Sequence, residues 1–213
     1  MSGGTPLRGL QRLARQPAPS PDEKCELCGE VIPHEHRHIV DTEARSLRCT
    51  CTPCYLLFSS RGAAGGRMKA VPDRYLSFPE FDLAPGQWDN LQIPVSVAFF
   101  FESTGSGGIV AFYPSPAGAT ESLLPLGAWE EIVAANAGLA TPDPDVEAFL
   151  VRSEKDQDTQ CFLVPIDVCY ELVGLLRQKW RGFDGGNEAR EQIDAFFDRI
   201  KNRAKPVQAG TPS

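Results

Sequence analysis

No apolar run in this sequence approaches the roughly 20 residues that a membrane-spanning helix requires. Basic residues are also few, since 21 Lys and Arg face 28 Asp and Glu and leave a formal charge of −7. Broad affinity for nucleic acid or anionic membrane needs clustered Lys and Arg, so we expect neither kind of partner. All three histidines lie between residues 34 and 38. A Ser/His/Asp catalytic arrangement elsewhere in the chain is therefore excluded.

The first 22 residues contain no continuous apolar segment of the kind that secretory signals carry. They are rich in Pro, Gly and Ser and are expected to form a disordered tail, as are residues 205–213. Five of the seven cysteines crowd into residues 25–54. In a chain without an export signal, this crowding favours metal ligation over a disulfide framework, and it predicts a cytoplasmic protein.

Between the tails, the composition predicts a four-cysteine zinc finger over residues 23–62, a connector over 63–92 and an α+β domain over 93–204. The connector is rich in Gly and Pro. It also carries aromatic residues, so we expect it to pack along a surface. These aromatic residues are Tyr75, Phe78, Phe81 and Trp88.

The α+β domain shows two hairpin–helix units and a final helix. The hairpins are predicted over residues 95–115 and 145–166, with helices over 124–138, 167–180 and 187–204. The order ββα-ββα-α predicts a mainly antiparallel four-stranded sheet, with the helices on one face and a C-terminal helix. Asp167 is placed to cap the second helix.

Two Cys-x-x-Cys pairs carry the strongest chemical signal. Cys25 and Cys28 are followed by Gly29, which lets the chain reverse tightly so that backbone amides point at thiolate sulfurs. Cys51 and Cys54 are followed by a segment typical of a helix start, and the residues between the pairs predict a hairpin. Knuckle, hairpin and helix form the treble-clef plan. We therefore predict a tetrahedral site with Cys25, Cys28, Cys51 and Cys54 as metal ligands.

The metal is predicted to be zinc, with iron as the alternative, because four thiolates suit both ions by geometry. The asymmetric second pair lacks the symmetry of rubredoxin. Cys49 precedes Cys51 on an extended segment and is a spare ligand, a thiol beside the metal ligands, or a buried residue.

Other candidate sites are weaker. His34, His36 and His38 at alternate strand positions would share one face, as a nickel or zinc patch or as a plain solvated strand. The finger superficially resembles an HNH nuclease, but it lacks a His soon after the second pair and an Asn in residues 39–54. Residues 112–122 indicate a ligand loop or, more simply, a turn leading to a helix. Cys161 and Cys169 have apolar neighbours and are expected in the core.

Several long phrases carry a family resemblance: "CELCGEVIPHEHRHIVDTEARSLRCTCTPCYLLF", "AVPDRYL", "LQIPVSVAFFF", "AFYPSPAGATES" and "VPIDVCYELVGLLRQKWRGFDGG". On these phrases the chain resembles an uncharacterised actinobacterial family of hydrogenase-associated proteins, encoded near high-affinity uptake [NiFe]-hydrogenases. The resemblance covers roughly residues 22 to 203. It implies an accessory role in hydrogenase assembly or electron transfer.

Three functional hypotheses follow. The first is a zinc-stabilised accessory protein that binds a hydrogenase subunit or maturation factor. The second is a rubredoxin-like iron protein that relays electrons for the hydrogenase. The third is an enzyme that uses the acid-rich body, for which the sequence offers no catalytic residues. A closed four-thiolate zinc site has no open position for substrate, so protein binding is preferred to catalysis.

Overall fold

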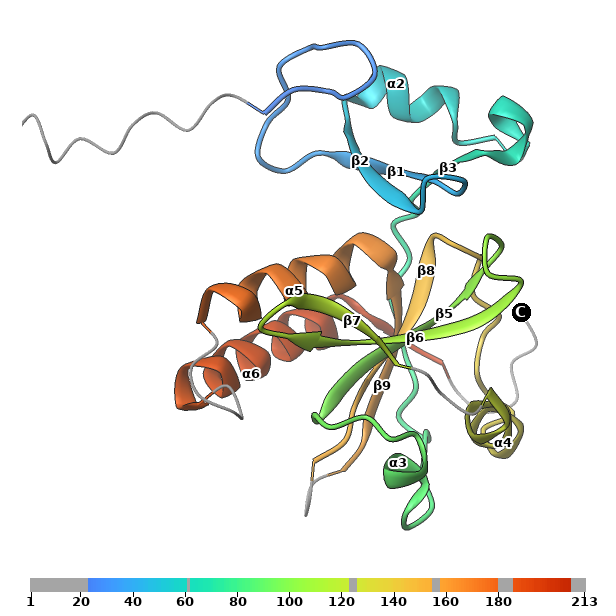
Figure 1. The fold of residues 1–213 in the computed structure, drawn as a ribbon, viewed down its shortest axis with the longest axis vertical. Helices are drawn as coiled ribbons and strands as arrows, with labels where there is room; N and C mark the ends of the chain where they lie inside the picture. Colours follow the sequence, from blue (N-terminus) through green and yellow to red (C-terminus); the bar gives the residue numbers. More distant parts are fainter. Residues whose placement is uncertain (1–22, 61, 123–125, 155–157, 180–185, 208–213) are drawn as a thin grey trace, which may run out of the picture.

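The computed structural model describes residues 23–60, 62–122, 126–154, 158–179 and 186–207 (Figure 1). The tail predicted over residues 1–22 lies outside these ranges, as do residues 208–213 of the tail predicted over 205–213. The start of that second tail is ordered instead, because Lys205–Pro206 pair with Leu76–Ser77 as a short strand. The described chain forms a three-stranded sheet in residues 23–70, here called the finger, and a seven-stranded sheet in residues 71–207, here called the body. The architecture is α+β, with antiparallel pairing throughout the finger and almost all of the body.

The finger has the predicted order of knuckle, hairpin and helix. Its sheet has the strand order β2-β1-β3. The third strand comes from the predicted connector, so the finger extends to Ala70 rather than ending at residue 62. Its elements are β1 (Arg37–Asp41), β2 (Ser46–Thr50), α2 (Thr52–Leu57), η1 (Ala63–Gly66) and β3 (Met68–Ala70).

The body sheet has the order β10-β4-β9-β8-β5-β6-β7. Only the β10–β4 pair is parallel among its described pairings. The strands are β4 (Leu76–Ser77), β5 (Val97–Ser103), β6 (Gly108–Ser115), β7 (Gly118–Ser122), β8 (Glu147–Arg152), β9 (Gln160–Pro165) and β10 (Lys205–Pro206). The helices are α3 (Gln87–Asn90), α4 (Leu126–Ala135), α5 (Ile166–Lys179) and α6 (Gly186–Arg203).

The prediction of a four-stranded sheet was wrong. The four predicted strands are present as the neighbours β9-β8-β5-β6, and three further strands extend them. On one side, Gly118 with φ 116° closes a tight turn, and β7 folds back on β6 within the segment expected to be a simple turn. On the other side, β4 and β10 have two residues each, too short for any alternating pattern to predict them.

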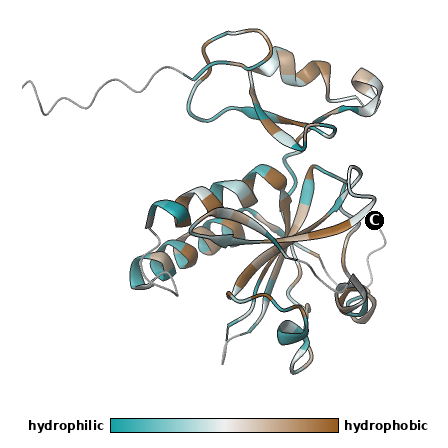
Figure 2. Ribbon diagram, in the orientation of Figure 1, coloured by the Kyte–Doolittle hydropathy of each residue, from teal (hydrophilic) through white to brown (hydrophobic). Residues whose placement is uncertain are grey.

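Helices cover both faces of the body sheet rather than one. On one face α5 and α6 pack over Phe99 and Phe101, and on the other α4 and the connector pack over Phe100. The Phe100 ring stacks on Trp129 of α4 with centroids 3.9 Å apart. Central strands such as β5 are therefore apolar on both sides, as Figure 2 shows in brown, and both sides require cover.

The connector packs on the body as predicted. Phe78 and Phe81 are buried, and Tyr75 and Trp88 are partly buried against the same cores. Arg74 pairs with the fully buried carboxylate of Glu147 on β8. No helix in the described ranges is both long enough and apolar enough to cross a membrane.

The finger and the body share a core and several polar contacts. Val40, Leu47 and Val71 belong to the same apolar cluster as β5, α5 and α6. Lys69 of β3 donates to Asp145 of the body across 2.7 Å. His38 of β1 donates from Nδ1 to Asp167 at the start of α5 across 2.9 Å. These contacts fix the finger's hairpin above the N-terminus of α5.

Candidate metal centre

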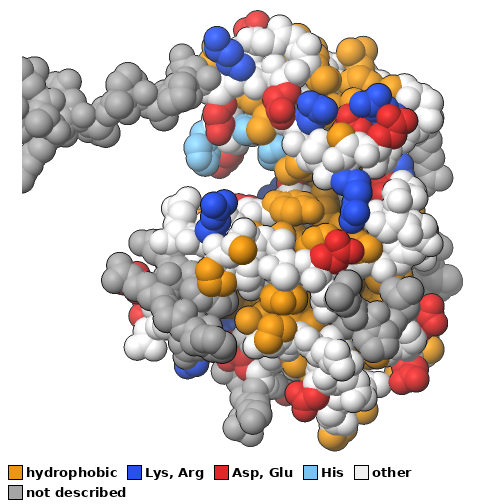
Figure 3. All heavy atoms as spheres, in the orientation of Figure 1, with side chains coloured by type: hydrophobic (Ala, Val, Ile, Leu, Met, Phe, Trp, Pro, Cys, Tyr) orange, Lys and Arg blue, Asp and Glu red, His pale blue; other side chains and the backbone are white. Residues whose placement is uncertain are grey.

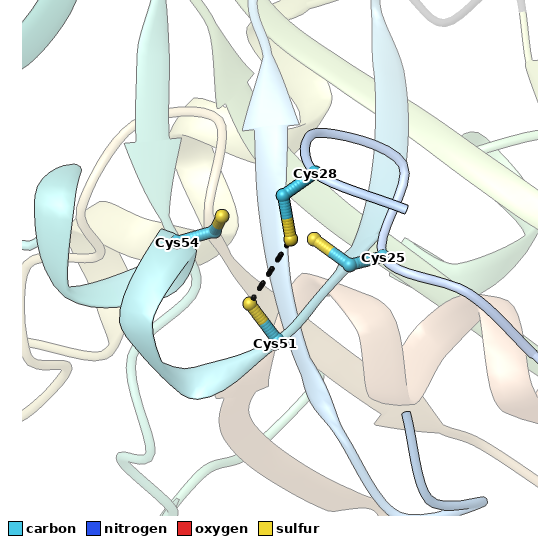
Figure 4. A group of neighbouring side chains, drawn as sticks. All are labelled: Cys25, Cys28, Cys51 and Cys54. Carbon is cyan, nitrogen blue, oxygen red and sulfur yellow. Dashed lines mark hydrogen bonds between the residues drawn. The ribbon is translucent and has the colours of Figure 1, made fainter. Parts of the chain in front are cut away.

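The first cysteine pair lies in a tight knuckle. The Gly29 N–H donates to the Cys25 carbonyl across 2.8 Å, and the Cys25 N–H donates to the backbone carbonyl of Glu30 across 2.7 Å. Gly29 adopts φ 78°, a left-handed conformation that glycine reaches without steric cost. The reversal that the sequence predicted at this glycine is therefore present, and it brings Cys25 and Cys28 to one side of the loop (Figure 4).

The second pair lies at the junction of β2 and α2. Cys51 is the extended residue before the helix, and its carbonyl accepts the first helical hydrogen bond from the Tyr55 N–H at 2.9 Å. Pro53 in the first turn suits a helix start, because proline has no N–H to leave unpaired there. Cys54 follows on the same turn. The helix start predicted at the second pair is confirmed.

All four predicted ligands come together. Their sulfur atoms lie within 4.8 Å of one another, and Cys28 and Cys51 are 3.6 Å apart (Figure 4). Sulfurs around a tetrahedral zinc lie about 3.8 Å apart, since each Zn–S bond is about 2.3 Å. The four sulfur donors and their spacing therefore fit a metal ion coordinated by four thiolates. This cluster could hold a metal ion, and its geometry suits zinc and iron alike.

The thiols of the cluster differ in acidity. Burial raises the pKa of Cys25, but hydrogen bonds from the backbone N–H groups of Cys51, Leu27 and Cys28 outweigh burial and lower it to about 6. The pKa of Cys54 is raised to about 12, first by its hydrogen bond with Cys51 and then by burial. Cys25 is therefore the first of these two to ionise, and a bound cation must displace the Cys54 proton.

Cys49 lies outside this cluster and joins two histidines instead. One ring nitrogen of His36, one ring nitrogen of His38 and the sulfur of Cys49 lie within 4.8 Å of one another. Burial raises the pKa of the Cys49 thiol, and the carboxylates of Glu26 and Glu23 add to this effect. Because β2 ends at Thr50, Cys49 and Cys51 serve different clusters although only one residue separates them.

The predicted three-histidine strand face is not formed. Strand β1 begins at Arg37, so His34 and His36 precede it, and His34 is exposed. The rings of His36 and His38 do meet, with centroids 4.7 Å apart. Figure 3 shows the histidine side chains gathered at the edge of the finger that faces the body. The sequence thus pointed to two of the three residues and missed Cys49 as their companion.

The body contains two buried cysteines and adjoins a cleft. Cys161 and Cys169 are buried in the body core as predicted, and burial raises the pKa of each thiol. A cleft of about 630 Å³ lies between the finger hairpin and the body sheet (Figure 3). Its lining is mostly apolar and includes Leu47, Phe101, Phe112 and Tyr170. Residues 112–122, offered by the sequence as a ligand loop or a turn, contribute Phe112, Ala119 and Glu121 to one wall. The sequence did not indicate the opposite wall, because the finger hairpin that forms it lies far away in the chain.

The finger and the body together match one known protein family. Residues 24–204 match a family of unknown function, DUF5947. The chain belongs to the DUF5947 family. The match begins one residue before Cys25 and ends one residue after α6, so it spans both the finger and the body. Comparisons with curated proteins and with solved structures give no match.

Proposed function

We propose that this DUF5947 protein is a zinc-stabilised accessory protein that binds another protein through its finger. The supporting observation is that most of the exposed large apolar side chains lie in the finger. Among the described residues, five large apolar side chains are exposed, and four of them belong to the finger. Each of the four lies within three positions of a cysteine of the four-thiolate cluster: Leu27, Val31, Leu56 and Leu57.

Exposed apolar side chains that gather on one part of a surface are typical of protein interaction sites. Helix α2 supports this reading, because none of its six residues is buried and its Leu57 side chain is 69 % exposed. Helix α2 is held by Cys54 and by Tyr55, whose hydroxyl donates to the Val71 carbonyl across 2.9 Å, and this leaves Leu56 and Leu57 free for a partner. A closed four-thiolate site offers no position for substrate, so the metal's role is to hold this surface in place.

Zinc is the proposed metal, and the cytoplasm is the proposed location. All seven cysteines are free thiols, a state that a reducing compartment maintains. The proposed partner is a subunit or maturation factor of an uptake [NiFe]-hydrogenase. That part of the proposal rests on the resemblance of the long sequence phrases described above.

A rubredoxin-like iron protein is the second candidate. The backbone N–H groups that donate to the Cys25 sulfur favour it, because such bonds tune the potential of iron–thiolate centres. The helix that begins at Thr52, between Cys51 and Cys54, speaks against it, since rubredoxin would carry a second knuckle there. Metal analysis and an absorption spectrum of the purified protein separate the two candidates. The zinc proposal predicts a colourless protein with one zinc in the four-cysteine site.

Binding is tested with purified hydrogenase subunits and maturation factors, by calorimetry against the full chain. Leu56→Glu combined with Leu57→Glu should abolish binding and leave the zinc content unchanged, because neither side chain is buried. Ala195→Glu on the exposed side of α6 is the matched control, which adds the same kind of charge to the body. Equal binding by the double variant and wild type would contradict the finger as the binding surface.

The role in the cell is tested by gene deletion. In a host that expresses the hydrogenase, the deletion should lower hydrogen uptake, and the wild-type gene should restore it. Restoration by the Leu56→Glu, Leu57→Glu variant would contradict the proposed role of this surface. Unchanged uptake in the deletion strain would contradict the hydrogenase role for the accessory protein and for the electron carrier alike.

A further inference from the structure

His36, His38 and Cys49 converge because of the register of the finger hairpin. His38 of β1 and Cys49 of β2 are directly opposite each other, as the pairing runs from Arg37 with Thr50 to Asp41 with Ser46. Side chains of such cross-strand partners lie on the same face with Cβ atoms about 5 Å apart. His36 precedes the strand, but its ring meets that of His38 with centroids 4.7 Å apart, which completes the group.

Hydrogen bonds determine which nitrogen carries the proton in the neutral form of both imidazole rings. The Nδ1 atom of His36 lies 2.9 Å from the Pro33 carbonyl oxygen and 3.0 Å from that of His34. A carbonyl oxygen only accepts, so this Nδ1 must carry the proton. In the same way His38 donates its Nδ1–H to the Asp167 carboxylate across 2.9 Å. In each neutral ring, Nε2 is then left with a lone pair.

The Nε2 atom of His36 has no partner. Its side chain is only 7 % exposed, and Nε2 is a buried nitrogen without a hydrogen bond in the described structure. A buried polar atom left unpaired costs free energy, and such an atom is a common sign of an unseen ion or water. Here it belongs to a group whose two other members are metal-binding side chains.

We propose that His36, His38 and Cys49 form a second metal site, for a divalent transition-metal ion such as Zn²⁺, with one coordination position open. The Nε2 atoms and the Cys49 sulfur are the ligands, and the thiol releases its proton to solvent as the ion enters. Three protein ligands and an open fourth position distinguish this site from the closed four-cysteine site.

The surroundings of the group match those of bound metal ions. Ligating histidines usually donate their other N–H to a carboxylate or a carbonyl, which orients the ring and strengthens the ligand. Asp167 does this for His38, and the Pro33 carbonyl does it for His36. Glu26 adds negative charge nearby, since its carboxylate accepts the Cys49 N–H at 2.6 Å. The site therefore has oriented ligands and a charge that favours a cation.

Asp167 also ties the proposed site to the body. Its Oδ1 accepts the Val168 N–H of α5 at 2.9 Å, while its Oδ2 accepts from His38. A cation bound at Nε2 makes the His38 ring a stronger donor to this carboxylate. Occupancy of the second site should therefore strengthen the junction between the finger and the body.

The test uses the full chain loaded with one equivalent of Zn²⁺ and then titrated with Co²⁺. Zinc outcompetes cobalt at such ligands, so it keeps the four-cysteine site and the added cobalt reports on any other site. One further equivalent of Co²⁺ should bind with tetrahedral ligand-field bands. Its thiolate-to-cobalt charge-transfer band should be roughly a quarter as intense as that of a four-thiolate cobalt site, because it has one sulfur instead of four. Azide should shift these bands by entering the open position.

Variants assign the ligands. His36→Gln, His38→Gln and Cys49→Ser should each abolish the cobalt signal and retain the one zinc, which shows that the finger is still folded. His34→Gln is the matched control and should bind cobalt like wild type, because His34 is exposed and outside the group. Asp167→Asn keeps an acceptor oxygen for the Val168 N–H and removes the charge behind His38. It should weaken cobalt binding by about 10- to 100-fold and leave the zinc unaffected.

Three outcomes would overturn the proposal. The first is no cobalt binding to the zinc-loaded wild type. The second is a cobalt signal that survives His36→Gln and His38→Gln. The third is a signal lost equally in His34→Gln. The site does not depend on the proposed partner, so none of these outcomes bears on protein binding by the finger.

Discussion

The finger and the body differ in what stabilises each of them. Among the described residues of the finger, only four apolar ones are buried: Cys25, Ile32, Ile39 and Val40. The body buries both faces of its central strands and packs α5 and α6 on one side and α4 on the other. A segment as small as the finger rarely folds on its own apolar burial. The four-cysteine cluster, which could hold a metal ion, is therefore expected to replace an apolar core in the finger.

Loss of a cysteine ligand should have the largest effect. Cys25→Ser and Cys54→Ser should each lose the metal and unfold the finger, because zinc sites of this kind contribute roughly 10 to 16 kcal/mol in model peptides. The body should keep its secondary structure. Metal analysis and circular dichroism measure the two effects separately. Full metal occupancy in either variant would break the four-ligand assignment.

A core truncation in the body should show the opposite pattern. Leu150 on β8 is fully buried at the centre of the sheet, so Leu150→Ala should cost about 2 to 5 kcal/mol of unfolding free energy. Denaturant unfolding measures the loss. The metal content of the folded protein should equal that of wild type. Metal release in proportion to the lost stability would show that the two halves are not held independently.

Asp41 tests the polar contacts within the finger. Its buried carboxylate accepts from Arg67, from the Ala44 N–H and from Arg48. These bonds, that of Arg67 first, hold the pKa of Asp41 well below its usual range. The contribution of the Asp41 carboxylate to the free energy of unfolding is therefore complete above the unfolded-state pKa of about 4. It is lost as the pH falls toward the folded-state pKa. It is present in full at neutral pH.

Asp41→Asn should accordingly loosen the metal-loaded finger at pH 7 without emptying it, since the amide offers one acceptor oxygen to two guanidinium groups. A chelator competition should show faster metal loss than in wild type and slower loss than in Cys25→Ser. Thr42→Ala, which removes a hydroxyl at the surface of the same turn, is a control that should behave like wild type. If Asp41→Asn released the metal at the wild-type rate, the Asp41 contacts would not contribute to the stability of the finger.

The smallest effect on the four-cysteine site is expected from Cys49→Ser. Cys49 lies outside the cluster, and its nearest partners are the histidines. The variant should keep the metal of the four-cysteine site at full occupancy, as measured by metal analysis. A loss comparable to that of Cys54→Ser would show that the wrong cysteines were assigned to the first site.

Short sequence motifs predicted the features that depend only on neighbouring residues, such as single turns, strands and helices. Gly29 after a Cys-x-x-Cys pair and Pro53 near a helix start are chemical requirements of single turns, so both were visible in the sequence. The four central strands and three of the four helices of the body, α4, α5 and α6, have clear apolar patterns for the same reason. The buried positions of Phe78 and Phe81 followed from their aromatic character.

Features made by distant segments were not predictable in this way. Strands β4 and β10 exist only because their partners are in place, and two residues carry no period. The grouping of His38 with Cys49 depends on the register of a hairpin, and a shift by one residue would have separated them. The Asp167 side chain was expected to cap the helix from the position before it, but α5 begins one residue earlier, at Ile166, and places Asp167 in its first turn. One carboxylate oxygen of Asp167 accepts the Val168 N–H, and the other reaches the finger, 129 residues earlier in the chain.

Alkylation of the cysteines, followed residue by residue with mass spectrometry, tests the central claim most directly. In the metal-loaded protein the four finger ligands, Cys161 and Cys169 should all resist iodoacetamide. After a chelator is added, Cys25, Cys28, Cys51 and Cys54 should become reactive while Cys161 and Cys169 stay protected by the body core. Equal reactivity of the finger cysteines before and after chelation, or exposure of Cys161 and Cys169 together with them, would contradict a metal-held finger beside an independently stable body.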